Sequence, residues 1–214
     1  TLSHVKTYAE AKAAQAAATA KAEAIEAALA EIAKVQGDVD AVEAAIAAVE
    51  AKLAEMNADY LIIESDISDE DCVKSIYSAV IARYGRVDIL VNNAATDDEN
   101  GFDTIEKITQ SVIDDTFAVN VRGSIMMMRE FINRRGDFGR IINISTDAAQ
   151  SFAGQITYGA SKATLEALTR SIALEAAQYG ITVNCVAPGP TQTGWIDEEF
   201  EKVVVPLIPM GRLV

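Results

Sequence analysis

The pattern of hydrophobic and polar positions changes near residue 57 of the chain. Before that point, apolar residues recur every three or four positions, as they do along one face of a helix. From about Val5 to Gln36 the sequence is almost entirely Ala, Lys, Glu and Gln, which are strong helix formers. Gly37-Asp38 supplies a helix stop and an N-cap, and a second helix follows with an a/d seam that ends at Met56. Residues 1–57 therefore predict an alanine-rich antiparallel αα-hairpin.

Short apolar runs alternate with longer amphipathic stretches after residue 57. The runs have the length of strands, and the stretches have the length and periodicity of helices. Strands that are joined by helices of this length pair in parallel, so residues 58–214 predict an α/β domain with a parallel sheet. The predicted strands are Tyr60–Ile63, Val87–Val91, Arg140–Ile144 and Ile181–Val186, and the predicted helices are Glu70–Tyr84, Thr104–Asp114, Asp115–Asn133 and Tyr158–Tyr179.

Polar or turn-forming residues follow the end of each predicted strand. They are Asp66, Asn92, Ser145 and Pro188. Parallel sheets bind their ligands at the carboxyl ends of the strands. We therefore expect these four positions to border one site.

Tyr158 and Lys162 stand four residues apart at the start of the longest predicted helix, and Tyr158 follows Ser145 by thirteen residues. Positions i and i+4 share a helix face, so the phenol oxygen and the ammonium can address one small volume. A free tyrosine has a pKa of ~10, and a fixed positive charge nearby favours the phenolate. Such a pair can exchange a proton with a carbonyl or an alcohol near neutral pH.

Five segments in this order resemble the short-chain dehydrogenase/reductase family of nicotinamide-dependent oxidoreductases. They are Asp88–Ala95, Phe117–Val121, the strand that ends at Ser145, Tyr158–Lys162 and Val183–Thr191. The resemblance extends from about Asn57 to Val214. Within it, the run Pro-Gly-Pro-Thr-x-Thr-Gly-Trp that begins at Pro188 is similar to a 3-oxoacyl-carrier-protein-reductase-like subgroup.

The resemblance implies a hydride transfer between the nicotinamide of NAD or NADP and a small carbonyl or alcohol substrate. By the same resemblance, Tyr158 acts as the general acid/base, and Lys162 lowers its pKa and holds the nicotinamide ribose. Ser145 polarises the carbonyl, and Asn120 holds a water that resupplies protons. The implied cofactor-binding residues are Asp66, Ile67, Asn92, Ala94, Tyr158, Lys162, Pro188, Gly189, Thr191 and Thr193.

Two of these positions have an equally simple structural interpretation. Asp66 matches the family residue that meets the adenine amino group, but it can also cap the helix that follows it. Asn120 is a single amide in an apolar helical stretch, and such an amide is often only structural. The sequence leaves both alternatives open.

The composition limits the partners of the chain. Its 214 residues are 50% hydrophobic and carry a formal net charge of −14, which disfavours nucleic acid and anionic membrane surfaces. No apolar run approaches the ~20 residues of a membrane span, and a single histidine, His4, argues against a metal site. The two cysteines predict reduced thiols and a cytoplasmic protein. The resemblance further implies a homo-oligomer, either a dimer or a tetramer.

The glycine-rich cofactor fingerprint of the family is not found in this sequence. The only glycine before Gly85 is Gly37, so no glycine-rich turn is available to bring a pyrophosphate onto a helix N-terminus. The predicted fold is therefore a Rossmann-like parallel sheet with flanking helices that lacks its first two strands and its last strand. It is preceded by the alanine-rich hairpin.

Three origins fit residues 1–57: a hairpin fused to a dehydrogenase fragment, an imperfectly assigned segment, or a fold whose missing strands come from a partner chain. We favour an artificial or imperfectly assigned segment, because such a density of alanine is uncommon beside an ordinary enzyme domain. Two functions remain open. One is an NAD(P)-dependent oxidoreductase, and the other is a non-catalytic scaffold or assembly protein that retains a dehydrogenase fragment.

Overall fold

A computed structural model describes residues 43–44, 46–48, 50–96, 104–150, 153–192 and 196–213. The chain divides into two compact units, Thr1–Ile62 and Ile63–Val214. The first helix of the predicted hairpin, Val5–Gln36, lies outside the described residues.

The second helix of the predicted hairpin is described in part and is helical up to residue 55. The turn that stops it contains Asn57, whose φ of 49° lies in the left-handed region. The Ala58 N–H donates a hydrogen bond of 3.0 Å to the Leu53 carbonyl, which is the bond of a Schellman stop. Met56 lies in this turn and is 73% exposed, so the helix ends one residue before the predicted seam does.

The described residues of the second unit form a parallel sheet of three strands in the order β1-β2-β3. The strands are β1 (Ile89–Asn92), β2 (Gly139–Ile144) and β3 (Ile181–Val186). The register places Asn92 beside Asn143 and Asn143 beside Cys185. This arrangement confirms the predicted parallel α/β sheet, and the predicted bounds of β3 match those observed.

Helical segments accompany these strands in the described residues of the second unit. They are α2 (Glu70–Tyr84), α3 (Gln110–Phe117), α4 (Ser124–Asn133), α5 (Ile156–Ala176) and α6 (Glu198–Val204), together with the π-helix η1 (Ala118–Gly123) and the short 3₁₀ turn η2 (Asp147–Ala149). Two further 3₁₀ turns, η3 (Ala177–Tyr179) and η4 (Val205–Leu207), follow α5 and α6. The predicted helices near Thr104–Asp114 and Asp115–Asn133 are in fact one run from Gln110 to Asn133, interrupted by η1. Thr109 starts this run later than predicted because its hydroxyl accepts the Val112 N–H and acts as the N-cap.

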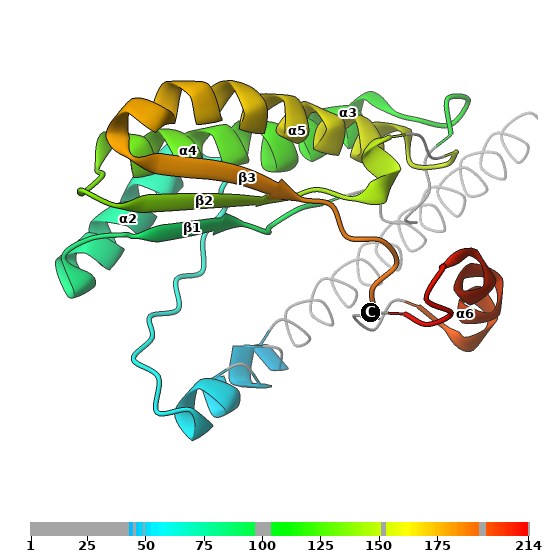
Figure 1. The fold of residues 1–214 in the computed structure, drawn as a ribbon, viewed down its shortest axis with the longest axis horizontal. Helices are drawn as coiled ribbons and strands as arrows, with labels where there is room; N and C mark the ends of the chain where they lie inside the picture. The colour runs from blue at the N-terminus through cyan, green and yellow to red at the C-terminus, as the bar shows by residue number, and fades with distance from the viewer. Residues whose placement is uncertain are drawn as a thin grey trace, which may run out of the picture. The chain divides into compact units, whose positions relative to one another are not determined.

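The hydrophobic core lies between one face of the sheet and the helices α4 and α5, which run along that face in Figure 1. Side chains alternate between the two faces of a strand, so Leu90 of β1 is buried while its neighbours Ile89 and Val91 are more than half exposed. The buried cluster consists of Val73, Tyr77, Leu90, Met126, Met128, Phe131, Ile141, Leu165, Ala176, Ile181 and Val183.

The predicted strand Tyr60–Ile63 is not observed, and residues 58–66 have no regular secondary structure. Leu61 and Ile62 within it are about 40% exposed. An apolar run forms a strand only where a neighbouring strand accepts and donates its backbone hydrogen bonds. In the described part of the chain this run is bonded to no strand, since the sheet consists of β1, β2 and β3.

Candidate active site

Ser145 lies directly after β2 and is 3% exposed. Its backbone N–H donates a hydrogen bond of 2.7 Å to the Val186 carbonyl, so the pairing with β3 extends one residue beyond the strand. Its hydroxyl donates a hydrogen bond of 2.8 Å to Glu166 Oε1 on α5. The main chain and the side chain of Ser145 are therefore both fixed by neighbouring elements.

Lys162 and Tyr158 lie one turn apart near the start of α5. The Lys162 Nζ is 5.6 Å from the centre of the Tyr158 ring and donates a hydrogen bond of 2.8 Å to the Ile144 carbonyl. Because Ile144 immediately precedes Ser145, this bond ties the ammonium to the strand end that carries the serine. The structure thus brings three of the four predicted catalytic residues, Ser145, Tyr158 and Lys162, close together.

The environment of Lys162 affects its charge. The side chain is 2% exposed, and this burial lowers the pKa of its ammonium, while the nearby Cys185 partly opposes the shift. Burial also raises the pKa of the Cys185 thiol, so the thiol form is favoured there. An ammonium in a site of low dielectric interacts more strongly with a phenolate than it does in water. The burial of Lys162 therefore supports the predicted effect on Tyr158.

Asn120 lies in η1 and is fully buried. Its Oδ1 accepts the Thr96 N–H at 2.8 Å, and its Nδ2 donates to the Thr96 carbonyl at 2.8 Å and to Ser161 Oγ at 3.0 Å. The side-chain amide therefore links the segment after β1 to α5. Any water held at this point would have to use other groups, so the predicted proton-supply role of Asn120 stays a prediction.

Ser161 is a buried residue that the motif analysis did not assign. It accepts the Asn120 amide and donates its own hydroxyl to the Tyr158 carbonyl at 2.7 Å. The sequence feature that could have identified Ser161 as a site residue is its position beside Lys162 in the Tyr-Gly-Ala-Ser-Lys segment. It connects the tyrosine's backbone to η1.

Asp66 and Ile67 are located in the loop before α2. The Asp66 side chain is exposed and accepts the Ser68 N–H at 2.8 Å, whereas Asp69 caps α2 by accepting the N–H groups of Asp71 and Cys72. The alternative reading of Asp66 as the helix cap is therefore wrong. Ile67 contacts η1 so closely that an added Cβ at Gly123 would lie 3.0 Å from the Ile67 carbonyl oxygen.

Asn92, at the end of β1, points into the sheet rather than into an open space. It is 7% exposed, and its Nδ2 donates to Asn143 Oδ1 at 2.8 Å. Asn143 in turn donates to Thr169 Oγ1 at 2.8 Å. These buried amides fix the register of the strand ends, and any cofactor contact of this segment would come from its backbone or from the exposed Ala94.

The bend after β3 is held against the loop that follows Ser145. The Asp147 N–H donates to the Pro188 carbonyl at 3.1 Å, and an added Cβ at Gly189 would lie 3.8 Å from Asp147 Oδ2. The Thr191 hydroxyl donates to the Gly189 carbonyl at 3.0 Å, so it is turned toward its own backbone. Thr193 lies outside the described residues.

These residues fit the nicotinamide ribose of a dinucleotide better than they fit its pyrophosphate. An ammonium has three N–H donors, and in the described part of the chain the buried Lys162 uses one of them, on Ile144. Its other donors suit the neighbouring hydroxyls of a ribose. For the pyrophosphate, the sequence offers no glycine-rich turn, since Gly37 is the only glycine before Gly85.

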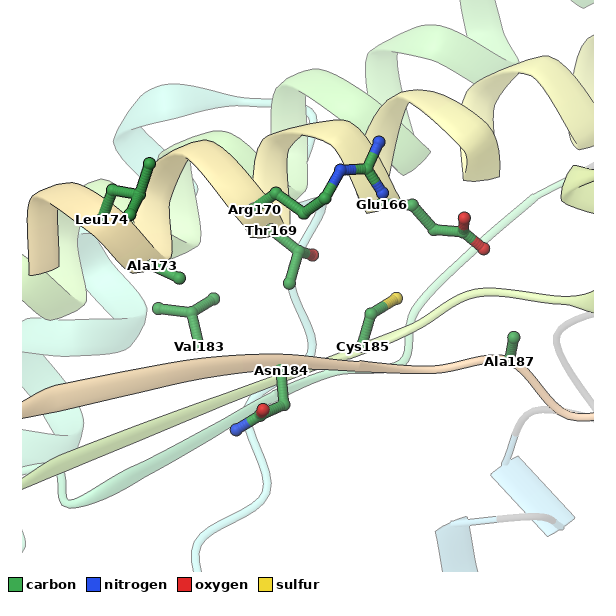
Figure 2. A pocket seen from close by; sticks show the side chains of 9 residues that line it. All are labelled: Glu166, Thr169, Arg170, Ala173, Leu174, Val183, Asn184, Cys185 and Ala187. Carbon is green, nitrogen blue, oxygen red and sulfur yellow. The ribbon is translucent and has the colours of Figure 1, made fainter. Parts of the chain in front are cut away.

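An open groove runs beside this site between α5 and β3 (Figure 2). Glu166 and Arg170 border it on the side of α5, where Arg170 extends along the helix toward Glu166, and Cys185 and Ala187 border it below. The carboxylate of Glu166 therefore faces both the buried Ser145 and the groove.

Two kinds of feature are missing from the described residues. No helix in the described segments combines the length and the apolar character that crossing a membrane requires. Nor do three His, Cys, Asp or Glu side chains gather closely enough in these segments to hold a metal ion.

The chain is similar to known proteins over most of its length. The family described as short chain dehydrogenase matches residues 13–203. YjdA of Bacillus subtilis, an uncharacterized oxidoreductase, is 34% identical over 153 residues, which cover 69% of this chain and 60% of that protein. The chloroplastic NADPH-dependent aldehyde reductase 2 of Arabidopsis thaliana is 39% identical over 152 residues, which cover 67% of this chain and 56% of that protein.

A solved structure shows the same fold. The 3-ketoacyl-(acyl-carrier-protein) reductase from Brucella melitensis, complexed with NADH, matches with a TM-score of 0.69 and 29% identity. The match covers 77% of this chain and 70% of that one. The chain spans about six tenths of the length of the two curated relatives.

Proposed function

The chain belongs to the short-chain dehydrogenase family, as its motifs predicted, and from that premise we propose that it is an NAD(P)-dependent oxidoreductase. The reaction is the transfer of a hydride to or from the carbonyl or alcohol carbon of a small molecule. One observation carries the proposal: the buried Lys162 is bonded to the Ile144 carbonyl, next to Ser145, and lies one helical turn from Tyr158.

Each side chain has a separate task in the proposed reduction of a carbonyl. Ser145 donates its hydroxyl proton in a hydrogen bond to the carbonyl oxygen, and Tyr158 transfers a proton to that oxygen. Lys162 stabilises the phenolate that remains and holds the ribose hydroxyls. The nicotinamide supplies the hydride to the carbonyl carbon when it is bound. Oxidation of an alcohol uses the same groups in reverse.

The cofactor is NAD or NADP, and the relatives named above include one NADPH-dependent protein and one complexed with NADH. For this chain, the proposed cofactor contacts are Asp66, Ile67, Asn92, Ala94, Tyr158, Lys162, Pro188, Gly189, Thr191 and Thr193. Of these, Lys162 is best supported, since its buried ammonium has donors available for a ligand.

We also propose a cytoplasmic homo-oligomer with a helical segment up to about residue 57 and a partial dehydrogenase domain after it. The free thiols of Cys72 and Cys185 fit a reducing compartment. The exposed Leu174 on α5, at 82%, and the exposed apolar side chains of β1 fit an association surface. The compact units Thr1–Ile62 and Ile63–Val214 fit the proposed division.

Tyr158→Phe tests the proposed reaction because it removes the exchangeable proton and keeps the ring. We expect turnover of carbonyl substrates to fall about 100- to 10,000-fold, the usual contribution of general acid/base catalysis. Turnover is followed by the absorbance of NADH or NADPH, and cofactor binding by fluorescence titration. We expect binding to persist.

Tyr179→Phe is the matched control. It removes a phenol oxygen in η3, after the far end of α5, and leaves the ring available to Arg135, so its turnover should equal that of the wild type. Undiminished turnover in Tyr158→Phe would overturn the assignment of the general acid/base. Absence of turnover in the wild-type chain with either cofactor would overturn the proposed function itself.

A further inference from the structure

The hydroxyl of Ser145 has one proton, and in this structure it is donated in a hydrogen bond to Glu166. The Oγ–Oε1 distance of 2.8 Å is that of a full hydrogen bond, and its acceptor is a carboxylate. Ser145 is 3% exposed, so water cannot easily replace this partner. A carbonyl substrate that accepts the same proton must therefore take it from Glu166.

Losing the serine hydroxyl leaves the Glu166 carboxylate without a donor. Glu166 is only half-buried and borders the groove of Figure 2, so a group on the substrate can reach it. A carboxylate accepts hydrogen bonds and, when ionised, donates none. The substrate group that restores its partner must carry an O–H or N–H donor.

The position of that donor follows from the geometry. A carbonyl oxygen bound to Ser145 Oγ lies one hydrogen-bond length, roughly 2.8 Å, from the serine oxygen. Glu166 Oε1 is itself 2.8 Å from the same serine oxygen. A hydroxyl or amine on the carbon next to the carbonyl can span the separation between these two positions.

We propose that Glu166 is a specificity residue that selects carbonyl substrates with a hydroxyl or amine on the carbon next to the carbonyl. The inference rests on the proposed function, and it adds a substrate class to it. When the substrate binds, its carbonyl oxygen accepts a hydrogen bond from the Ser145 hydroxyl. The substrate's own O–H or N–H then replaces Ser145 as the hydrogen-bond donor to Glu166. A ketone without such a donor makes no hydrogen bond to the Glu166 carboxylate, so it lacks a charge-assisted bond that the donor-bearing ketone gains.

The other charged groups near the carboxylate do not supply this donor. Lys162 is four residues earlier on α5, and its ammonium is directed to the Ile144 carbonyl. Arg170 is four residues later and borders the groove, and no ion pair links it to Glu166 among the described residues. Cys185 of β3 has a raised pKa and remains a thiol, which is a weak donor.

The test compares 1-hydroxybutan-2-one with 1-methoxybutan-2-one as substrates. Both have an oxygen on the carbon next to the carbonyl, so its inductive effect on the carbonyl is similar, but only the first has a donor. For the wild type we expect kcat/KM for the hydroxyketone to exceed that for the methoxyketone by at least about 10-fold, the discrimination expected from a hydrogen bond to a charged group. In Glu166→Leu the ratio should fall to about one.

Two further variants complete the experiment. Glu166→Gln keeps the volume of the side chain and one acceptor oxygen, so it should fold and should reduce the ratio several-fold. Glu175→Gln, an exposed glutamate on the same helix, is the matched control and should leave the ratio unchanged.

A wild-type ratio near one, or a ratio unchanged in both Glu166 variants, would overturn the inference while the proposed function stands. Absence of turnover with both ketones in the wild type, and with every other carbonyl substrate, would instead overturn the proposed function together with the inference. Loss of preference in the Glu166 variants alone would support the substrate class.

Discussion

Lys162 is buried at a position where the protein gains little stability from it. Removing an ammonium from water is unfavourable, and the single hydrogen bond to the Ile144 carbonyl compensates for only part of that loss. The lowered pKa of Lys162 reflects this, since burial is its largest cause. A buried lysine whose ammonium is directed at one strand end is typical of a functional group, because an apolar residue would stabilise the same place better.

The unfavourable burial of the Lys162 ammonium should appear in the pH dependence of the free energy of unfolding. Between the lowered pKa of folded Lys162 and the value of about 10.4 in the unfolded chain, the unfolded state binds the proton more tightly. The free energy of unfolding should therefore rise with pH in that window, by up to about 1.4 kcal/mol per pH unit from this group. In Lys162→Met this contribution should be absent. Urea unfolding at a series of pH values up to about 10 measures the slope.

The matched control for this experiment is Lys107→Met. Lys107 is exposed, and its substitution should leave the slope of the wild type intact. Equal slopes in Lys162→Met and the wild type would show that Lys162 titrates alike in the folded and unfolded states. That result would remove the electrostatic argument for its action on Tyr158.

At the scale of elements, the start of α5 is positioned by very close packing against η2. An added Cβ at Gly159 would lie 2.8 Å from the Ala148 carbonyl oxygen, closer than real Cβ contacts allow. The obstacle is backbone, so it cannot rotate away as a flexible side chain would. Gly159 directly follows Tyr158, and the contact therefore sets the distance of the phenol from the loop after Ser145.

Gly159→Ala should displace the first turn of α5 and lower turnover more than stability. We expect kcat to fall by at least about 10-fold, because small displacements of catalytic groups reduce rates strongly. The free energy of unfolding should fall by about 1–3 kcal/mol, as for other overpacked sites. Steady-state kinetics and urea unfolding measure the two effects.

Gly136→Ala serves as the control, since no atom of the described residues lies within 4 Å of its added Cβ. It should leave both quantities near those of the wild type. If Gly159→Ala retains full turnover, the packing of α5 on η2 does not position Tyr158.

The sequence predicted elements well where their boundaries depend on local chemistry. The bounds of α2 match because Asp69 caps its start and Gly85, with a φ of 82°, ends it. The strand Tyr60–Ile63 was wrong because a strand depends on a partner that the run itself does not reveal. The partners of the site residues were equally hidden. The bond between Ser145 and Glu166 links residues from two elements, and only the packing of α5 on the sheet brings them together.

For the whole molecule, the formal net charge of −14 opposes the proposed cofactor, which is itself an anion. This repulsion acts at long range, whereas the attraction of Lys162 acts over a few ångströms inside a buried site. Salt screens the long-range repulsion more than the attraction of Lys162, because the screening length falls from about 30 Å at 0.01 M to about 8 Å at 0.15 M.

The affinity for cofactor should therefore increase with salt over this range, contrary to the usual behaviour of anion sites on basic proteins. We expect the Kd of NADH to fall at least about twofold between 0.01 M and 0.15 M ionic strength, as the repulsive field is screened. NADPH carries a further phosphate, so its Kd should fall by a larger factor. Fluorescence titration at several salt concentrations measures both.

A charge variant separates the field of the chain from other effects of salt. Glu198, Glu199 and Glu201 lie exposed in the first turn of α6, and their joint replacement by Gln removes three negative charges from the chain. The salt dependence of this triple variant should be weaker than that of the wild type. If the affinity of the wild type instead falls with salt for both cofactors, exposed cations must dominate the binding. The site would then extend to a basic surface beyond Lys162, and the net charge of the chain would not govern cofactor capture.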